Sequence, residues 1–175
     1  VETHTMYRYR YFFSILPAFL TLLWLGQQKR VGGEAVVDGP YILYRKDTTF
    51  VYTILEHSGQ RSLHTEIIIG AARKDIRFSV PTGNPNESFQ VMIKPKLQSE
   101  KSEYRKVSKQ LAISDIERNL KGFLKLLIAG KVIDDQFNWT FGDGHLVLTG
   151  DFFDRGNQVT ELLWFIYSLE EKAKA

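Results

Sequence analysis

Two carboxylates and an arginine occur within five positions near the C-terminus, in the segment HLVLTGDFFDRG that begins at His145. A short apolar run, residues 146–148, leads into a turn that contains Gly150 and Asp151. Asp154 and Arg155 follow this turn. Carboxylates supply oxygen ligands to hard or borderline cations, and the planar guanidinium group matches the oxygens of a phosphate. The segment therefore predicts a metal cation held beside a phosphate group.

A second pair of carboxylates follows another apolar strand. Residues 110–115 end in the carboxylate of Asp115, and Glu117 lies two positions further. Apolar residues then recur at helical spacing from 119 to 130, before the strand at 146–148. A strand-helix-strand unit favours a parallel pair with a right-handed crossover. Asp115 and Asp151 would then lie beyond the carboxyl ends of neighbouring strands, where open α/β sheets bind ligands.

Both segments are similar to motifs of one protein family. GDFFDRG resembles the G-D-x-x-D-R-G box of calcineurin-like metallophosphoesterases, in particular the phosphoprotein-phosphatase branch and its bacterial relatives. The segment SDIERN at residues 114–119 is similar to the D-x-H-G-N box of the same family. It departs from that box at Glu117, where the usual ligand is His, and at Arg118, where Gly is usual and allows a freer backbone.

The resemblance implies a role for each matched residue. Asp115 and Glu117 would ligate a first divalent cation, and Asp151 would bridge it to a second one. Asp154 would orient a histidine further along the chain without contacting metal, and Arg155 would hold a phosphate oxygen. The two cations would be drawn from Mn, Fe, Zn and Mg, and oxygen ligands favour Mn²⁺ or Mg²⁺ over Zn²⁺.

Helix capping is the competing interpretation of two of these carboxylates. Asp115 precedes a helix expected to begin near residue 116, and Asp154 precedes one expected near residue 158. His57, His64 and His145 are expected to be turn or loop residues, because no further ligand types lie at a metal-site spacing from them.

Composition narrows the possible functions. The 175 residues contain no cysteine, which excludes disulfides, thiolate metal sites and a cysteine nucleophile within the chain. The net charge of +3 resides in residues 1–30, which hold four basic side chains and one acidic one. The other 145 residues are balanced, so we expect no nucleic-acid partner.

The N-terminal segment has the pattern of an export signal. Arg8 and Arg10 precede a mostly apolar run at residues 12–26 that contains no charged side chain. We expect residues 1–30 to be a signal peptide or a membrane anchor with the rest of the chain outside, which predicts a cell-envelope protein, anchored or exported to the periplasmic side. A buried helix of a soluble domain is the remaining alternative.

Residues 31–105 are expected to form a small β-rich accessory domain with a linker. Five runs of β-branched and aromatic residues are separated by turn-forming residues, which suggests a small antiparallel sandwich or barrel. Residues 94–109 are polar and predict a linker or a solvated strand edge.

The expected fold class is α+β or α/β: an N-terminal hydrophobic helix, the small antiparallel β domain, and the first βαβ unit of an incomplete metallophosphoesterase α/β sandwich at residues 106–175.

The G-N-H box and later histidines of that family are absent. The resemblance therefore implies an inactive N-terminal fragment of an enzyme that hydrolyses phosphomonoesters, phosphoproteins or dinucleoside polyphosphates. The alternative is an envelope binding or assembly protein with a degenerate motif. The expected partners are a phosphorylated substrate and, through residues 1–30, a membrane; the oligomeric state stays open.

Overall fold

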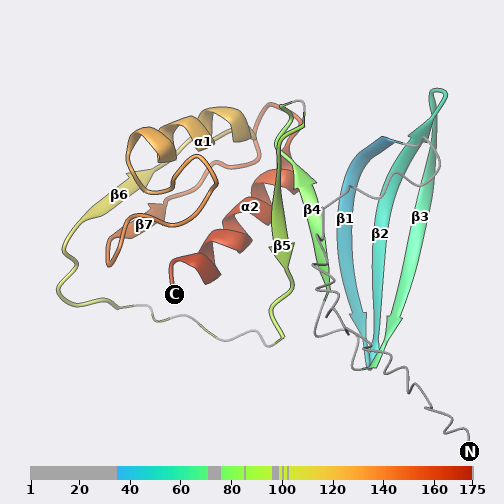
Figure 1. Cartoon of the computed structure of the whole chain (residues 1–175), viewed down its shortest axis with the longest axis horizontal. Helices are drawn as coiled ribbons and strands as arrows, with labels where there is room; N and C mark the ends of the chain where they lie inside the picture. Colours follow the sequence, from blue (N-terminus) through green and yellow to red (C-terminus); the bar gives the residue numbers. More distant parts are fainter. Residues whose placement is uncertain are drawn as a thin grey trace, which may run out of the picture.

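A computed structural model of the chain describes residues 35–70, 76–84, 86–95, 99, 101 and 103–174 (Figure 1). These residues form seven strands and two helices. In chain order the elements are β1 (Ala35–Arg45), β2 (Thr48–His57), β3 (Gln60–Ile69), β4 (Arg77–Pro81), β5 (Ser88–Met92), β6 (Gln110–Ile113), α1 (Leu120–Ala129), β7 (His145–Leu148) and α2 (Val159–Lys172).

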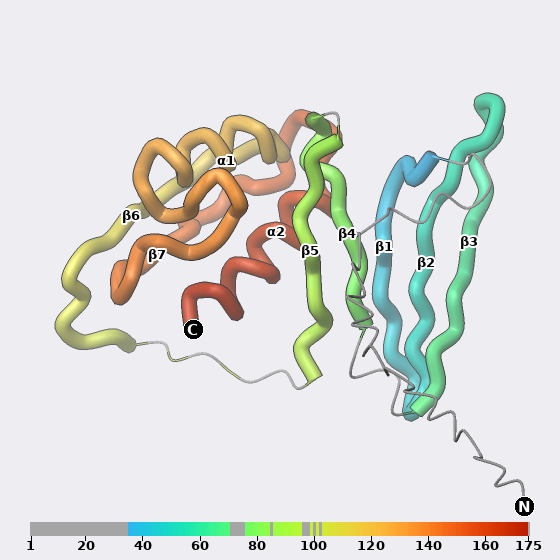
Figure 2. Tube along the Cα trace, viewed as in Figure 1, coloured from blue at the N-terminus to red at the C-terminus, as the bar shows by residue number. Residues whose placement is uncertain are grey.

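The first three strands form an antiparallel sheet in the order β1-β2-β3 (Figure 2). Two tight turns connect them, and Lys46, Ser58 and Gly59 in these turns adopt positive φ angles, as hairpin turns require. The central strand β2 buries Val51 and Leu55. Short turns thus separate these strands, as the turn-forming residues between the strand runs predicted.

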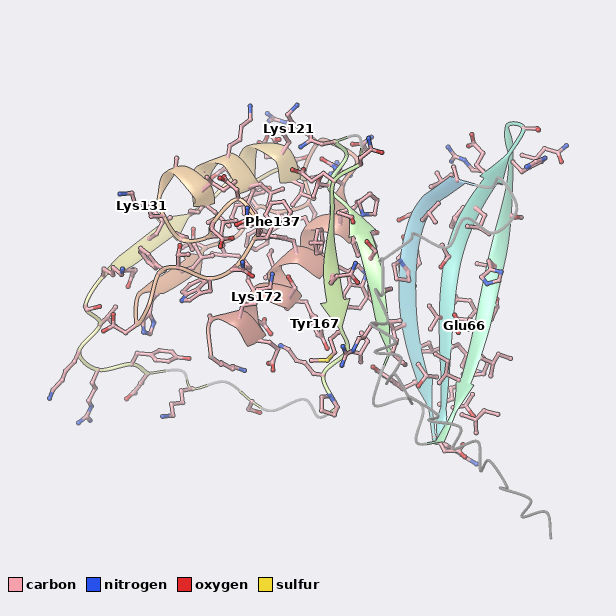
Figure 3. All side chains as sticks on the ribbon, in the orientation of Figure 1. Glu66, Lys121, Lys131, Phe137, Tyr167 and Lys172 are labelled. Atoms are coloured by element: carbon pink, nitrogen blue, oxygen red, sulfur yellow. The ribbon has the colours of Figure 1, made fainter. Side chains whose placement is uncertain are left out.

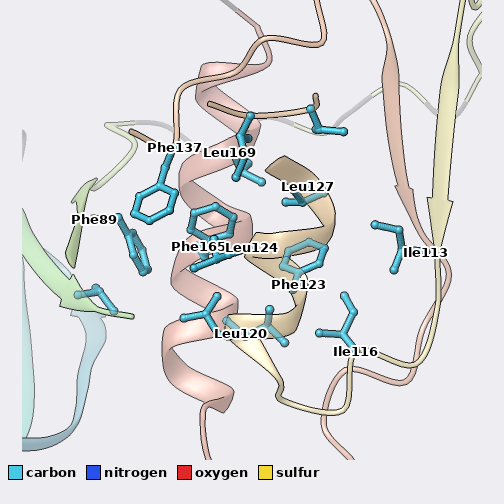
Figure 4. Packing of buried hydrophobic residues seen from close by; sticks show 14 of the residues in the cluster. Phe89, Ile113, Ile116, Leu120, Phe123, Leu124, Leu127, Phe137, Phe165 and Leu169 are labelled. Atoms are coloured by element: carbon cyan, nitrogen blue, oxygen red, sulfur yellow. The ribbon is translucent and has the colours of Figure 1, made fainter. Parts of the chain in front are cut away.

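The next two strands, β4 and β5, form a separate hairpin that belongs to the main core. Val80, Phe89 and Val91 alternate along the hairpin and are almost fully buried. They pack toward Phe165 of α2, whose ring meets that of Phe89 edge-on with 5.2 Å between centroids (Figure 4). Burying one apolar face of a hairpin against a helix supplies most of the stabilisation that a two-stranded sheet lacks by itself.

The last sheet consists of β6 and β7, which pair in parallel with α1 between them in sequence. Helix α1 begins after Asn119, whose side-chain oxygen accepts a hydrogen bond from the Gly122 N–H at 2.8 Å. Its buried face joins the same core as α2, and that face consists of Leu120, Phe123, Leu124 and Leu127.

The fold class expected from the sequence is wrong in its overall plan. Among the described residues strands outnumber helices, and these strands form three small sheets, not the layered α/β sandwich that was expected. The five strands expected in one antiparallel unit are divided, because the apolar face of β4 and β5 packs on α2. Residue alternation determines which face of a strand is buried but not which element covers it.

The expected N-terminal hydrophobic helix lies outside the described residues. Within the described part of the chain, neither helix has the length and apolar character needed to cross a bilayer. Export or anchoring through residues 1–30 therefore stays a prediction.

Two sets of contacts join distant segments to α2. The Trp164 indole N–H donates to the Pro40 carbonyl at 2.9 Å, which holds β1 beside the start of the helix. At the other end, the Lys172 ammonium group donates to the Phe137 carbonyl at 2.6 Å (Figure 3). Helix α2 is thus the element on which the three-stranded sheet, the β4–β5 hairpin and the loop before β7 converge.

Candidate functional site

The parallel pairing of β6 and β7 brings two loops side by side. Ile113 and Leu148 are register partners at the ends of the strands. Beyond them the Glu117 N–H donates to the Asp151 carbonyl at 3.1 Å, and the Arg118 N–H donates to the Phe152 carbonyl at 2.8 Å. Backbone hydrogen bonds between the two segments thus continue beyond the ends of β6 and β7, and they connect the two carboxylate-bearing loops directly.

The backbone of both loops is held in the left-handed region. Asp115, Glu117 and Asp151 have φ angles of 55°, 50° and 52°. Non-glycine residues adopt this region at an energetic cost, and such residues are concentrated at functional sites. A side chain at Gly156 would lie 2.8 Å from the Glu117 carbonyl oxygen, so the absence of a Cβ there allows the loops to approach.

Three carboxylates converge at this junction. One oxygen each from Asp115, Glu117 and Asp151 lies within 4.8 Å of the other two. Opposite oxygen ligands of Mg²⁺ are about 4.2 Å apart, since each metal–oxygen bond measures about 2.1 Å. The separation of the three oxygens is therefore close to the spacing of ligands around one divalent cation. The donor set is entirely oxygen, which suits Mg²⁺ or Mn²⁺.

Arg155 lies next to this carboxylate cluster. Its Nη1 atom is 3.4 Å from Glu117 Oε1, and its Nε atom is 3.8 Å from Asp154 Oδ2. Asp154 also accepts a hydrogen bond from the Arg155 backbone N–H at 3.0 Å. Asp154 thus contacts the arginine and lies outside the cluster. The Arg155 side chain is 75% exposed, which leaves its remaining N–H groups open to an incoming anion.

The structure excludes helix capping as the role of Asp115 and Asp154. Asn119, not Asp115, caps α1. Helix α2 begins after Gln158, and no side-chain hydrogen bond caps it. Asp115 and Asp154 are therefore not explained by helix formation.

Arg118 lies at the position where the D-x-H-G-N box usually has Gly. It adopts a φ angle of 60°, so this arginine takes the backbone conformation that glycine would take easily. Its Nε–H donates to the Arg155 carbonyl, which ties the first loop to the second. The side chain also lines a cleft of about 450 Å³ beside β1 and α2.

The cleft was not found from the sequence, because its walls come from segments far apart in the chain. Its lining residues are Asp38, Pro40, Tyr41, Arg118, Asn157, Val159, Thr160, Leu163 and Trp164. Aromatic and β-branched residues in strands are ordinarily packing residues, so Tyr41 carried no signal of its own.

A hydrogen-bond network fixes the wall contributed by β1. The Tyr41 hydroxyl donates to Asp38 Oδ2 at 2.6 Å, and the Thr160 hydroxyl donates to Asp38 Oδ1 at 2.9 Å. Burial alone would raise the pKa of Asp38, but these bonds and one from the Gly39 N–H outweigh it and hold that pKa below its usual value. Asp38 is therefore a negative charge within the cleft at neutral pH.

Comparison with solved structures shows similarity to cold-active protein tyrosine phosphatases. No protein-family model and no curated protein sequence matches the chain. A cold-active protein tyrosine phosphatase solved at 1.1 Å is 32% identical, with a TM-score of 0.63 over 80% of this chain and 39% of that one. The cold-active protein tyrosine phosphatase of a psychrophilic Shewanella species is also 32% identical, with a TM-score of 0.62 over 78% of this chain and 39% of that one. The chain thus spans about two fifths of these solved chains.

These similarities correct the family expected from the sequence motifs. The matching structures are named protein tyrosine phosphatases, and none is named a calcineurin-like metallophosphoesterase. The motif resemblance covered only short segments, whereas the structural similarity extends over 78–80% of the chain. A short box specifies local backbone and ligand types, and many folds can carry the same chemistry.

Proposed function

We propose that this chain carries a metal-dependent phosphatase site, in which Asp115, Glu117 and Asp151 hold a divalent cation and Arg155 contacts the phosphate. The observation that carries the proposal is the convergence of the three carboxylates within 4.8 Å at the junction of two loops. Similarity to a protein tyrosine phosphatase at 32% identity supports phosphate-ester hydrolysis as the reaction.

The proposed chemistry follows from the groups available. A bound divalent cation would polarise a phosphoryl oxygen as a Lewis acid. The Arg155 guanidinium would form paired hydrogen bonds to phosphate oxygens, in exchange for its contact with Glu117. Cysteine is absent from the chain, so its residues offer no thiolate nucleophile.

The finer features of the site are also proposals. A second cation would need ligands besides this cluster, since no other such acidic or histidine group occurs among the described residues. We propose phosphorylated protein side chains as the substrate class, by analogy with the name of the similar phosphatase.

Hydrolysis of phosphotyrosine in the presence of Mn²⁺ tests this function, with released inorganic phosphate as the readout. We expect a chelator to abolish turnover and Asp151→Asn to lower kcat/KM by about 100-fold, because a lost ligand removes on the order of 2.7 kcal/mol of transition-state stabilisation. Asp135→Asn is the matched control, because Asp135 is exposed and lies outside the cluster. Turnover that persists after metal removal would contradict the proposal.

A further inference from the structure

The cleft beside β1 borders the proposed phosphate site. Arg118 lines the cleft and directly follows Glu117 of the carboxylate cluster. Asn157, which also lines the cleft, lies in the same loop as Arg155. The two loops that would contact a phosphate therefore also contribute residues to the wall of this cleft.

The walls of the cleft are largely apolar and aromatic. Tyr41 and Leu163 line it and are 45% and 47% exposed, so both side chains are accessible to a ligand. Trp164, Pro40 and Val159 complete the apolar lining. A volume of about 450 Å³ lies in the range of about 300–1,000 Å³ that is typical of small-molecule sites.

Charge orients a ligand within the cleft. Arg118 provides a positive charge on the side of the carboxylate-bearing loops, whereas Asp38 provides a negative charge on the wall formed by β1. A phosphate group is attracted toward the first and repelled by the second. An anionic group is therefore disfavoured beside Asp38, and the apolar side chains of the lining favour an apolar group there.

The walls are held in place before any ligand arrives. The Trp164 indole donates to Pro40, and Thr160 and Tyr41 both donate to Asp38, so that α2 and β1 are connected across the cleft. Preorganised aromatic walls favour a flat ring, because offset-stacked and edge-on ring contacts stabilise it beyond simple area burial.

From these observations we infer that the cleft between β1 and the start of α2 binds the aryl group of a phosphate-ester substrate whose phosphate lies on the loops of Glu117 and Arg155. Tyr41, Leu163 and Trp164 would determine the preference for aryl over alkyl esters, and Arg118 would position the ester between the two sites. The inference rests on the proposed function.

Binding of two non-hydrolysable probes separates the cleft from the phosphate site. Phenylphosphonate and methylphosphonate have the same charged phosphonate group, and only phenylphosphonate carries an aromatic ring. Isothermal titration with Mn²⁺ present would give the two dissociation constants for the wild type, for Leu163→Asn, and for Leu63→Asn as the matched control. Leu63 is an exposed leucine on β3 that does not line the cleft.

We expect the wild type to bind phenylphosphonate more tightly than methylphosphonate, and Leu163→Asn to weaken only the phenyl compound, by about fivefold, because apolar contact with the ring is lost. Leu63→Asn should leave both constants unchanged. Equal binding of the two probes by the wild type, or an aryl preference that survives Leu163→Asn, would overturn the cleft assignment and leave the proposed function standing. Failure of both probes to bind in a Mn²⁺-dependent manner would overturn the proposed function, and the cleft inference with it.

Discussion

The backbone N–H of Glu117 donates a hydrogen bond to the carbonyl oxygen of Asp151 at 3.1 Å. The two residues belong to loops that follow different strands, and this bond fixes their backbones relative to one another. Because both side chains belong to the same carboxylate cluster, the bond also limits how far their oxygens can separate. A cation site assembled in this way depends on the packing of the two loops as much as on the ligands.

Gly156→Ala tests that dependence. The new Cβ would lie 2.8 Å from the Glu117 carbonyl oxygen, and the φ angle of +76° at this position disfavours any side chain. We expect a loss of about 1–3 kcal/mol in the free energy of unfolding and weaker Mn²⁺ binding. Gly142→Ala is the control, because Gly142 also has a positive φ but a Cβ there meets nothing within 4 Å. Equal losses in both variants would show that loop packing is unimportant.

Glu117→Gln should weaken Mn²⁺ binding about tenfold or more, since a neutral amide replaces a charged oxygen ligand. Asp154→Asn should change this affinity much less, because Asp154 contacts Arg155 and is not part of the cluster. Titration of Mn²⁺ followed by electron paramagnetic resonance measures both constants. A larger effect at Asp154 than at Glu117 would refute the assignment of ligands.

Arg155→Met is expected to have opposite effects on the two ligands. Mn²⁺ binding should become tighter, because a positive charge 3.4 Å from Glu117 is removed. Inorganic phosphate should bind about tenfold less tightly, because its charge-assisted hydrogen bonds are lost. Calorimetric titration with each ligand in turn measures the two changes, and parallel weakening of both would indicate a structural role instead.

Glu161→Gln should stabilise the protein in a pH-dependent manner. Burial raises the pKa of Glu161, and the negative charge of Asp38 adds to the effect. A raised carboxyl pKa means that stability is fully present below the unfolded-state pKa and is lost as the pH rises through the folded-state pKa. The gain in Tm over wild type should therefore be larger at about pH 8 than at about pH 4. The exposed Glu103→Gln should show no such difference.

Phe165→Ala should be among the most destabilising substitutions in the core. Phe165 is fully buried and meets the rings of Phe89, Phe123 and Phe137 edge-on. Removing it leaves a cavity where α1, α2 and the β4–β5 hairpin meet, at a cost of about 3–5 kcal/mol. Urea unfolding measures the loss. A cost below about 1 kcal/mol would show that the hairpin does not depend on α2.

Local patterns in the sequence predicted many of the individual elements. Runs of β-branched and aromatic residues indicated the strands of the β4–β5 hairpin, helical spacing indicated α1, and a helix was expected near the start of α2. The prediction that Asp115 and Asp151 follow neighbouring parallel strands is confirmed by the pairing of β6 with β7. These features depend on residues close together in the chain, which is why a linear pattern reveals them.

The sequence by itself determined which functional groups are available: carboxylate oxygen ligands, an arginine near them in the chain, and no thiol. Only the tertiary structure decided that Asn119 rather than Asp115 caps α1, that β4 and β5 join the α2 core, and that β1 and α2 enclose a cleft next to Arg118. The cap is a local contact between Asn119 and Gly122, whereas the other two outcomes arise from contacts between distant segments. Residue type and spacing specify what a segment can bury or bind, whereas the partner it meets depends on how the whole core packs.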